Sequence, residues 1–324
     1  MMARTRVYRD GVLAAEGIPV ADVSDYLADP ETTVWLDFCA PTEADLAAIS
    51  EELGLHPLAV EDAVHEHQRA KLDRYDSHSF LTAYSAVLDG TDGIVVVSEL
   101  AAFITGQALV TVRKDENFPI DAVVARWDSA AELAKNGVGF LVHGLLDHIV
   151  DGHFEVVQAL DEQIEALEDL VFDERPRYAD MQRRSFALRK SLVRIRRVVL
   201  PMREVLNTVM RRDLHLVDSE LQPYFQDIYD HVLRASEWTE SLRDLVTTIR
   251  ETQLNIQGNR LNTIMKKVTS WAAIIAIPTA VTGFYGQNVP YPGFQTSAGF
   301  WTSTLVIVVL SLALYVSFKK RDWL

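Results

Sequence analysis

Two long stretches near the C-terminus contain no charged residue. They run from Thr269 to Gly286 and from Phe300 to Phe318. Each is close to the ~20 residues that a helix needs to cross the hydrocarbon core of a bilayer, which is ~30 Å thick. The pattern therefore predicts two transmembrane helices at the end of the chain.

Basic residues flank these stretches on their outer sides: Lys266 and Lys267 before the first, and Lys319, Lys320 and Arg321 after the second. The positive-inside rule places such flanks in the cytoplasm. We therefore expect an inner-membrane protein with both termini in the cytoplasm and only residues 287–299 outside. The alternative, two core helices of a soluble protein, is disfavoured because charge-free length and basic flanks coincide twice.

The first span differs from the second, because small and polar residues follow one another along it at alternating steps of three and four. A stripe at this spacing lies on one face of a helix. Such a face in a membrane is expected to border protein or water rather than lipid. Two spans cannot enclose a pore alone, so an oligomer is expected. The predicted pore-lining stripe is Glu251, Asn255, Gly258, Asn262, Met265, Thr269, Ala272, Ala276, Thr279 and Gly283.

The stripe continues upstream of the membrane, and no helix-stopping signal occurs back to Pro223, a residue suited to the first turn of a helix. A continuous helix from there to Gly286 would be roughly 95 Å long at 1.5 Å per residue. Apolar residues also recur at helical spacing over residues 139–172 and 181–212, which predicts a hairpin of two long helices. Together these helices are expected to form a stalk.

The N-terminal part shows strand-like runs instead: Val34–Phe38, Phe80–Val87, Ile94–Ile104 and Ala108–Arg113. Asp10-Gly11 between two short apolar runs predicts a hairpin. The expected fold class is an α+β membrane protein with an α/β cytoplasmic domain (1–135), a helical stalk that includes the long pore helix (136–265) and two transmembrane helices (266–324).

The composition argues against some classes of protein. The formal charge is −15, which argues against nucleic-acid binding, and a single cysteine excludes an internal disulfide framework. One basic cluster, from Arg183 to Arg197, would by itself predict nucleic-acid binding. Pairing with the acidic residues of the preceding helix, from Glu162 to Asp169, is the interpretation that we prefer.

A second cluster contains residue types that bind zinc: His56, Glu61, Asp62, His65, Glu66 and His67. Its spacing matches neither the two-histidine motif of metalloproteases nor a zinc finger, so zinc is disfavoured there. No nucleophile elbow, phosphate-binding loop or dinucleotide fingerprint occurs, and an enzyme is not expected.

The residues that end both spans carry a family resemblance. Tyr285-Gly286-Gln287-Asn288, a short loop, and a second span that ends Phe318-Lys319-Lys320-Arg321-Asp322-Trp323-Leu324 resemble the CorA family of magnesium channels. Leu53 to Asp62, followed by His67 to Leu72, resembles the cytoplasmic signature of that family. The resemblance covers essentially the whole chain.

The resemblance implies a homopentamer in the lipid bilayer that conducts Mg²⁺, with a selectivity filter at Gly286, Gln287 and Asn288. It also implies a hydrophobic constriction at Met265 and Val268. The family carries Met where this chain has Gln287, and the acidic residue usual in the outer loop is missing. Zinc, cobalt or nickel therefore stays open as the transported ion, as in the ZntB branch.

The resemblance further implies a regulatory Mg²⁺ site. Asp227 stands in the segment that bears a regulatory ligand in the family, and Asp89 and Asp92 are candidate partners from a neighbouring subunit. A different class of function, a membrane-anchored binding or signalling protein, is the remaining rival. The polar face of the first span argues against it.

Overall fold

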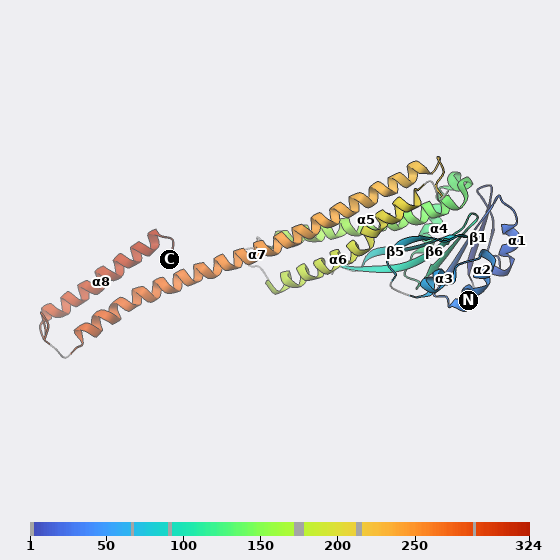
Figure 1. The fold of residues 1–324 in the computed structure, drawn as a ribbon. Coiled ribbons are helices and arrows are strands. Elements are labelled where there is room, and N and C mark those ends of the chain that lie inside the picture. The colour runs from blue at the N-terminus through green and yellow to red at the C-terminus, as the bar shows by residue number, and fades with distance from the viewer. Residues whose placement is uncertain (1–2, 66–67, 90–92, 172–177, 212–215, 288–289) are drawn as a thin grey trace. The chain divides into compact units, whose positions relative to one another are not determined.

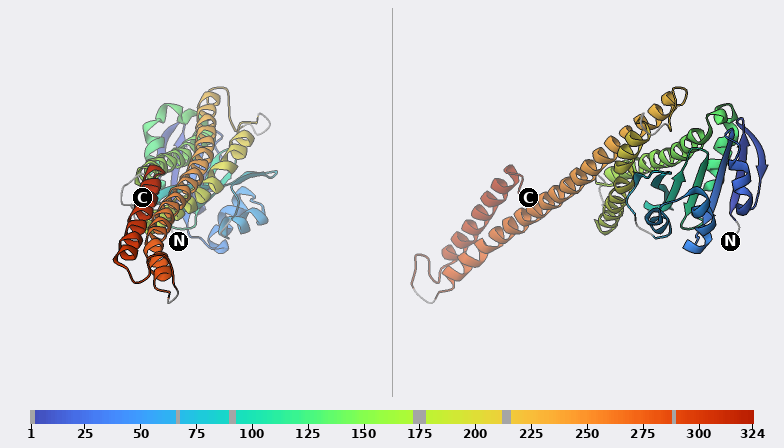
Figure 2. Two further views of the ribbon diagram at one scale, coloured as in Figure 1. Left: turned by 90° about the vertical axis from the view of Figure 1, so that its left-hand side faces the viewer. Right: turned by 45° about the vertical axis from the view of Figure 1, so that its right-hand side comes forward.

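The computed structural model describes residues 3–65, 68–89, 93–171, 178–211, 216–287 and 290–324. By its internal contacts the chain divides into two units, residues 1–248 and 249–324. Figures 1 and 2 show the ribbon. Helix α7 (Gln222–Tyr285) begins in the first unit and continues in the second.

A seven-stranded sheet forms the base of the first unit, with the strand order β2-β1-β3-β7-β6-β5-β4. All neighbouring strands are antiparallel except β3 and β7, which are parallel. The strands are β1 (Arg4–Arg9), β2 (Val12–Glu16), β3 (Thr32–Cys39), β4 (Lys71–Arg74), β5 (Ser79–Asp89), β6 (Ile94–Ile104) and β7 (Ala108–Arg113).

Helices cover both faces of this sheet. On one face they are the short turn η1 (Val20–Asp22), α1 (Val23–Leu27), α2 (Glu43–Leu53) and α3 (Pro57–Val64). On the other they are α4 (Ile120–Ser129), η2 (Ala131–Asn136), α5 (Gly137–Val171), α6 (Tyr178–Val209) and the start of α7. Each face has its own buried hydrophobic cluster, so the unit is a three-layer α/β/α sandwich extended by long helices.

Local sequence signals explain several of these elements. Asp10 and Gly11 both have positive φ, 48° and 77°, as the tight turn between β1 and β2 requires. Thr42 caps α2 reciprocally with Asp45, since each side chain accepts a hydrogen bond from the other residue's backbone N–H. Gly54 closes α2 in the left-handed conformation.

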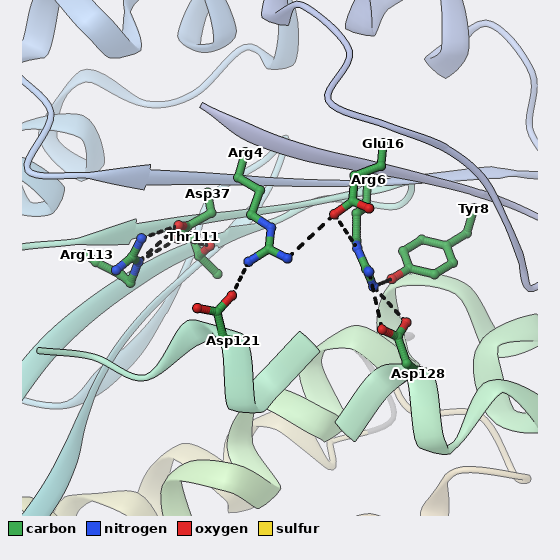
Figure 3. A network of polar contacts seen from close by, with 9 residues as sticks. All are labelled: Arg4, Arg6, Tyr8, Glu16, Asp37, Thr111, Arg113, Asp121 and Asp128. Carbon is green, nitrogen blue, oxygen red and sulfur yellow. Dashed lines mark hydrogen bonds and ion pairs between the residues drawn. The ribbon is translucent and has the colours of Figure 1, made fainter. Parts of the chain in front are cut away.

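A polar network joins the strand ends to α4 (Figure 3). The Asp37 carboxylate accepts hydrogen bonds from the Arg113 guanidinium at 2.7–3.1 Å and from the Thr111 hydroxyl at 2.8 Å. Burial opposes the charge of Arg113, but the hydrogen bonds to Asp37 raise the pKa of Arg113 overall. Nearby, the Arg6 guanidinium binds Asp128 at 2.7 Å and Glu16 at 3.1 Å.

The predicted elements are largely confirmed. The β1–β2 hairpin and the four predicted strands are present, and α5 and α6 match the predicted helical hairpin within a few residues. The continuous helix expected from Pro223 to Gly286 is α7. The short strand β4 (Lys71–Arg74) was not predicted.

Candidate ion pathway

Two helices of the described chain are long and apolar enough to cross a membrane, namely α7 and α8 (Ser297–Lys320). In the most apolar stretch of each helix, only 6% of the residues are buried. A core helix of a soluble protein would be mostly buried, so that alternative is wrong. The two spans expected from the charge-free stretches therefore have the exposure that lipid contact requires.

Within the second unit, α8 runs back alongside the end of α7 (Figure 2). The side chains of α7 that lose exposure there share one face. Ser270 is fully buried, and Ile274, Ile277, Val281 and Tyr285 are half-buried. Their spacing of three and four residues makes this the face that packs on α8.

The predicted pore-lining stripe lies on a different face. Thr269, Ala272, Ala276, Thr279 and Gly283 are all exposed. At ~100° of rotation per residue, the stripe is centred roughly 150° from the face that packs on α8. The chain's own second span therefore leaves the small and polar face of α7 uncovered.

The stripe keeps this exposure toward the start of the second unit. Met265 and Val268, the expected constriction, are 66% and 64% exposed. Gly258 is the exception, because it is half-buried. The remaining members are exposed: Glu251, Asn255 and Asn262.

Pro278 interrupts the hydrogen bonds of α7 inside the apolar stretch. Proline has no N–H to donate to the carbonyl of Ile274, one turn earlier. Two hydroxyl groups bond the backbone nearby: Thr282 Oγ1 donates to the Pro278 carbonyl at 2.8 Å, and Thr279 Oγ1 to the Ile275 carbonyl at 3.2 Å. Threonine can remain in the span because its hydroxyl is satisfied by the helix itself.

The expected selectivity filter follows the last turn of α7. The Gly286 N–H donates to the Thr282 carbonyl at 2.8 Å, and the Gln287 N–H donates to the Phe284 carbonyl at 3.3 Å. Both residues are exposed. Asn288, the central residue of the prediction, lies outside the described residues.

The loop between α7 and α8 is held to both helices. The Tyr291 hydroxyl donates to the Tyr285 carbonyl at 2.9 Å, and the two rings pack edge to face with centroids 4.9 Å apart. Gly293 approaches α8 so closely that a Cβ on Gly299 would lie 2.3 Å from its carbonyl oxygen. The Thr296 hydroxyl caps α8 by accepting from the Gly299 N–H.

The predicted regulatory residues are only partly described. The Asp227 side chain on α7 is 69% exposed, and its carboxylate lies 3.9 Å from Nε2 of His231. Asp89 is the exposed last residue of β5. Asp92 lies outside the described residues, and the pairing of Asp227 with Asp89 of a neighbouring subunit stays a prediction.

Charged residues beside Asp227 were missed by the sequence analysis. Arg126 on α4 pairs with Asp147 and, at 2.8 Å, with Asp151, both on α5. Asp151 also lies 3.8 Å from Nδ1 of His231. Although burial lowers it, the pKa of Arg126 is raised overall by these carboxylates. The four-residue spacing of the two aspartates, which places them on one face of α5, was the available signal.

The disfavoured zinc cluster finds no support in the described residues. The His56 ring accepts from the Leu58 N–H at 3.2 Å, and Asp62 pairs with Lys71 at 2.9 Å. Across the part of the chain that the structure describes, no three His, Cys, Asp or Glu side chains converge as a metal site would require. Glu66 and His67 fall outside that part.

Several known proteins are similar to this chain in sequence or in fold. The cobalt/magnesium transport protein CorA of Thermotoga maritima is 28% identical over 91% of this chain and 85% of its own length. The zinc transport protein ZntB of Yersinia enterocolitica is 24% identical over 93% of this chain and 90% of its own. The solved CorA magnesium transporter of Methanocaldococcus jannaschii superposes with a TM-score of 0.81 at 21% identity, covering 100% of this chain and 99% of that one.

The sequence profile described as "CorA-like Mg2+ transporter protein" matches residues 30–320. It thus spans strands β3 to β7, the long helices and both candidate spans. The chain therefore belongs to the CorA-like family, and it is a divalent-cation transporter rather than an enzyme.

Proposed function

We propose that this protein is a Mg²⁺ channel, formed by five copies of the chain around the small and polar face of α7. The observation that carries the proposal is the exposure of Thr269, Ala272, Ala276, Thr279 and Gly283 on the side away from α8. A bilayer is a poor solvent for that face, whereas a water-filled axis shared by several copies suits it. In this proposal residues 1–135 form the cytoplasmic domain, 136–265 the stalk and 266–324 the membrane part.

The chemistry of the stripe favours hydrated Mg²⁺. This ion sheds its water reluctantly and prefers oxygen ligands in octahedral geometry. A ring of Asn288 amide oxygens would hold the hydrated ion through hydrogen bonds without removing its water. The stripe contains no His or Cys that would favour a softer cation.

Uptake into proteoliposomes that contain only this protein tests the proposal. Wild-type protein is expected to admit Mg²⁺, and Asn288→Ala is expected to abolish uptake while leaving assembly intact. Gln287→Ala is the matched control next to it, and it should retain most of the uptake. Normal Mg²⁺ uptake by Asn288→Ala would refute the assignment of the filter.

Topology follows from the basic flanks. We expect Ser297, the exposed first residue of α8, to lie outside the cell and both termini to lie in the cytoplasm. In a Cys39→Ser background, a cysteine at Ser297 should react with an impermeant maleimide added to intact cells. A cysteine at Asp10 should react only after lysis; labelling of that position from outside contradicts the topology.

Regulation by internal Mg²⁺ completes the proposal. Without the cation, the exposed Asp227 would repel a carboxylate such as Asp89 of a neighbouring copy by ~1 kcal/mol at 4 Å in water, and by more where solvent is excluded. Bound Mg²⁺ would remove this repulsion and close the constriction at Met265. Asp227→Ala should therefore make the channel less sensitive to internal Mg²⁺. If inside-out patches of this variant close at the wild-type concentration, Asp227 is not part of the sensor.

Zinc is the second candidate ion, because Gln287 replaces the methionine of the family motif and one similar protein is a zinc transport protein. The same proteoliposomes separate the two ions. If Zn²⁺ enters and excess Mg²⁺ does not compete with it, the channel is a zinc transporter and the Mg²⁺ proposal fails.

A further inference from the structure

The outward face of α6 carries an unusual alternation of apolar and basic side chains. Phe186, Lys190, Val193, Arg197 and Leu200 follow one another at steps of four and three residues, and all are exposed. Phe186 is 71% exposed. Single exposed apolar residues are ordinary, but a row of them on one helix face marks an interaction surface. We call these five residues the α6 stripe.

The cations of the α6 stripe form no ion pair with an acidic residue in the part of their own subunit that the structure describes. Within the described residues, the ion pairs of α6 are Arg69 with Glu204, Arg183 with Asp180 and Arg196 with Glu240, and neither Lys190 nor Arg197 takes part. The pairing expected from the sequence, between these cations and the acidic residues of α5, does not occur in that part of the chain. That expectation is wrong within one subunit.

The outward face of α5 has the complementary pattern. A row of mostly acidic residues runs along it at the same steps of four and three residues, and it is exposed apart from the half-buried Asp151. We call this row the α5 stripe: Asp151, Glu155, Gln158, Glu162, Glu165 and Asp169.

An apolar groove of about 360 Å³ borders the α5 stripe. Its wall on α5 includes Gly152, Val156 and Ala159, and its wall on β5 includes Ala86 and Val87. Val87 is 49% exposed, so apolar surface lies directly beside the acidic row. Cations alone would not need this groove, whereas a helix face with both apolar and basic side chains fits it.

We propose that the α6 stripe of one subunit docks on the α5 stripe and the adjoining groove of the next copy of the same chain. The inference rests on the proposed ring of identical subunits. In such a ring each contact joins two different faces, so one basic and one acidic face per chain are sufficient to close it. Opposite charge also fixes the register and excludes contacts between like faces.

The levels of the residues agree with this docking. α5 and α6 lie side by side and run in opposite directions (Figure 1), and rotation about an axis along them keeps each residue at its own height. Lys190 is twelve residues after the start of α6, and Ala159 is twelve residues before the end of α5, so both lie ~18 Å from their ends of the hairpin. Lys190 then falls between Glu155 and Glu162 of the neighbour.

Two further members of the α6 stripe fall at matching levels. By the same measure Val193 lies at the height of Val156, which lines the apolar groove. Arg197 lies at the height of Gly152, between Asp151 and Glu155. In this docking the cations of the α6 stripe lie beside carboxylates of the neighbour, and Val193 lies beside the neighbour's apolar groove.

Disulfide cross-linking of the full-length protein in membranes tests the contact. Two differently tagged chains, both in the Cys39→Ser background, carry Lys190→Cys and Glu162→Cys respectively. Co-expression and mild oxidation should give a covalent dimer that contains both tags, while either chain expressed alone should give none. Glu132→Cys, at an exposed position away from both stripes, replaces Glu162→Cys as the matched control and should give no dimer.

Charge reversal supplies a second measurement. The double variant Lys190→Glu/Arg197→Glu should dissociate at a lower temperature than wild type, and Glu155→Lys/Glu162→Lys in the same chain should restore the wild-type value. Native mass spectrometry separates the two proposals. An oligomer without the mixed cross-link and without sensitivity to charge reversal overturns this interface alone, whereas a monomer overturns the ring itself.

Two other outcomes would also overturn the interface. Cross-linking of Lys190→Cys with itself would mean that like faces meet. If charge reversal changes only the amount of anionic lipid that co-purifies with the chain, the α6 stripe binds lipid headgroups instead of a second copy.

Discussion

The two segments of α7 belong to one continuous helix but have different surroundings. Between Gln222 and Thr248, apolar residues such as Phe225, Ile228 and Val232 are buried against the rest of the first unit. Between Ile249 and Tyr285, apolar residues as large as Trp271 and Ile275 remain exposed. Most apolar side chains of the first segment are covered within one chain, whereas most of those of the second are not.

Because of this difference, substitutions in the two segments should change different properties of the protein. A substitution in the first unit removes contacts that one chain makes with itself, so it should lower the free energy of unfolding. A substitution on the uncovered face of α7 removes no contact within the chain, so it should change transport and leave folding unaltered. Four experiments test this distinction, in order of decreasing effect.

Thr279→Leu should have the largest effect, the loss of nearly all ion uptake, because it places a bulky side chain on the small and polar face of α7. Thr282→Leu is the matched control. Both threonines are exposed and bond a carbonyl one turn earlier, but Thr282 lies off that face. Uptake into proteoliposomes measures both. Equal loss in the two variants would mean that the stripe does not line the pathway.

Asp37→Ala should destabilise the first unit by about 3–5 kcal/mol, since it leaves the guanidinium of Arg113 largely buried without its carboxylate. Urea unfolding of the full chain, followed by the fluorescence of the buried Trp35 and Trp127, measures the change. Asp121→Ala is the control, because its pair with Arg4 is exposed and should contribute about 1 kcal/mol or less. A loss as small for Asp37→Ala would contradict the role assigned to the buried pair.

Acid should destabilise the first unit through His153, whose ring is fully buried and donates from Nε2 to the Tyr84 carbonyl at 2.7 Å. Burial lowers the pKa of His153 to about 4, against ~6.5 in the unfolded chain. Between these values the unfolded state binds a proton that the folded state does not. Stability should therefore fall by roughly 3 kcal/mol as the pH drops from ~6.5 to ~4.

Removing the titrating group checks this assignment. His153→Gln can still donate to the Tyr84 carbonyl but does not titrate, so unfolding should depend less on pH in that range. Part of the dependence should remain, because burial also lowers the pKa values of His143 and His148. An unchanged pH profile in His153→Gln would exclude His153 as the main source.

Tyr291→Phe should have the smallest effect. It removes one hydrogen bond to the Tyr285 carbonyl, worth about 1 kcal/mol. Amides at the end of α7 should then exchange with deuterium roughly fivefold faster. Exchange in the β-sheet should be unchanged, since the sheet belongs to the other unit. Faster exchange there as well would mean that the two units unfold together.

The elements with strong periodicity were predictable from the sequence. β6 and β7 have the predicted bounds, and α5, α6 and α7 differ from prediction by only a few residues at each end. β4 escaped notice because Lys71 to Arg74 has mostly charged side chains and half-buried positions, so no alternation marks it. Its place at the edge of the sheet is set by pairing with β5, which is a tertiary effect.

The small and polar face of α7 was predictable from the sequence, whereas its role as the ion pathway stays a prediction. Spacing alone identifies which residues share a face of α7, and the five stripe members in the apolar stretch are all exposed: Thr269, Ala272, Ala276, Thr279 and Gly283. Spacing does not reveal which residues of other helices approach that face. The group formed by Arg126, Asp147 and Asp151 was missed for the same cause, because its members come from two helices joined only by folding.

The absence of charge between Val268 and Phe318 has a consequence for voltage. Moving one elementary charge through a membrane potential of 100 mV changes the free energy by about 2.3 kcal/mol, and a divalent ion gains about twice that. No side chain of the two spans carries a charge on which the field could act. We therefore expect a channel without gating charge, in which voltage sets how fast the ion moves and leaves the probability of opening unchanged.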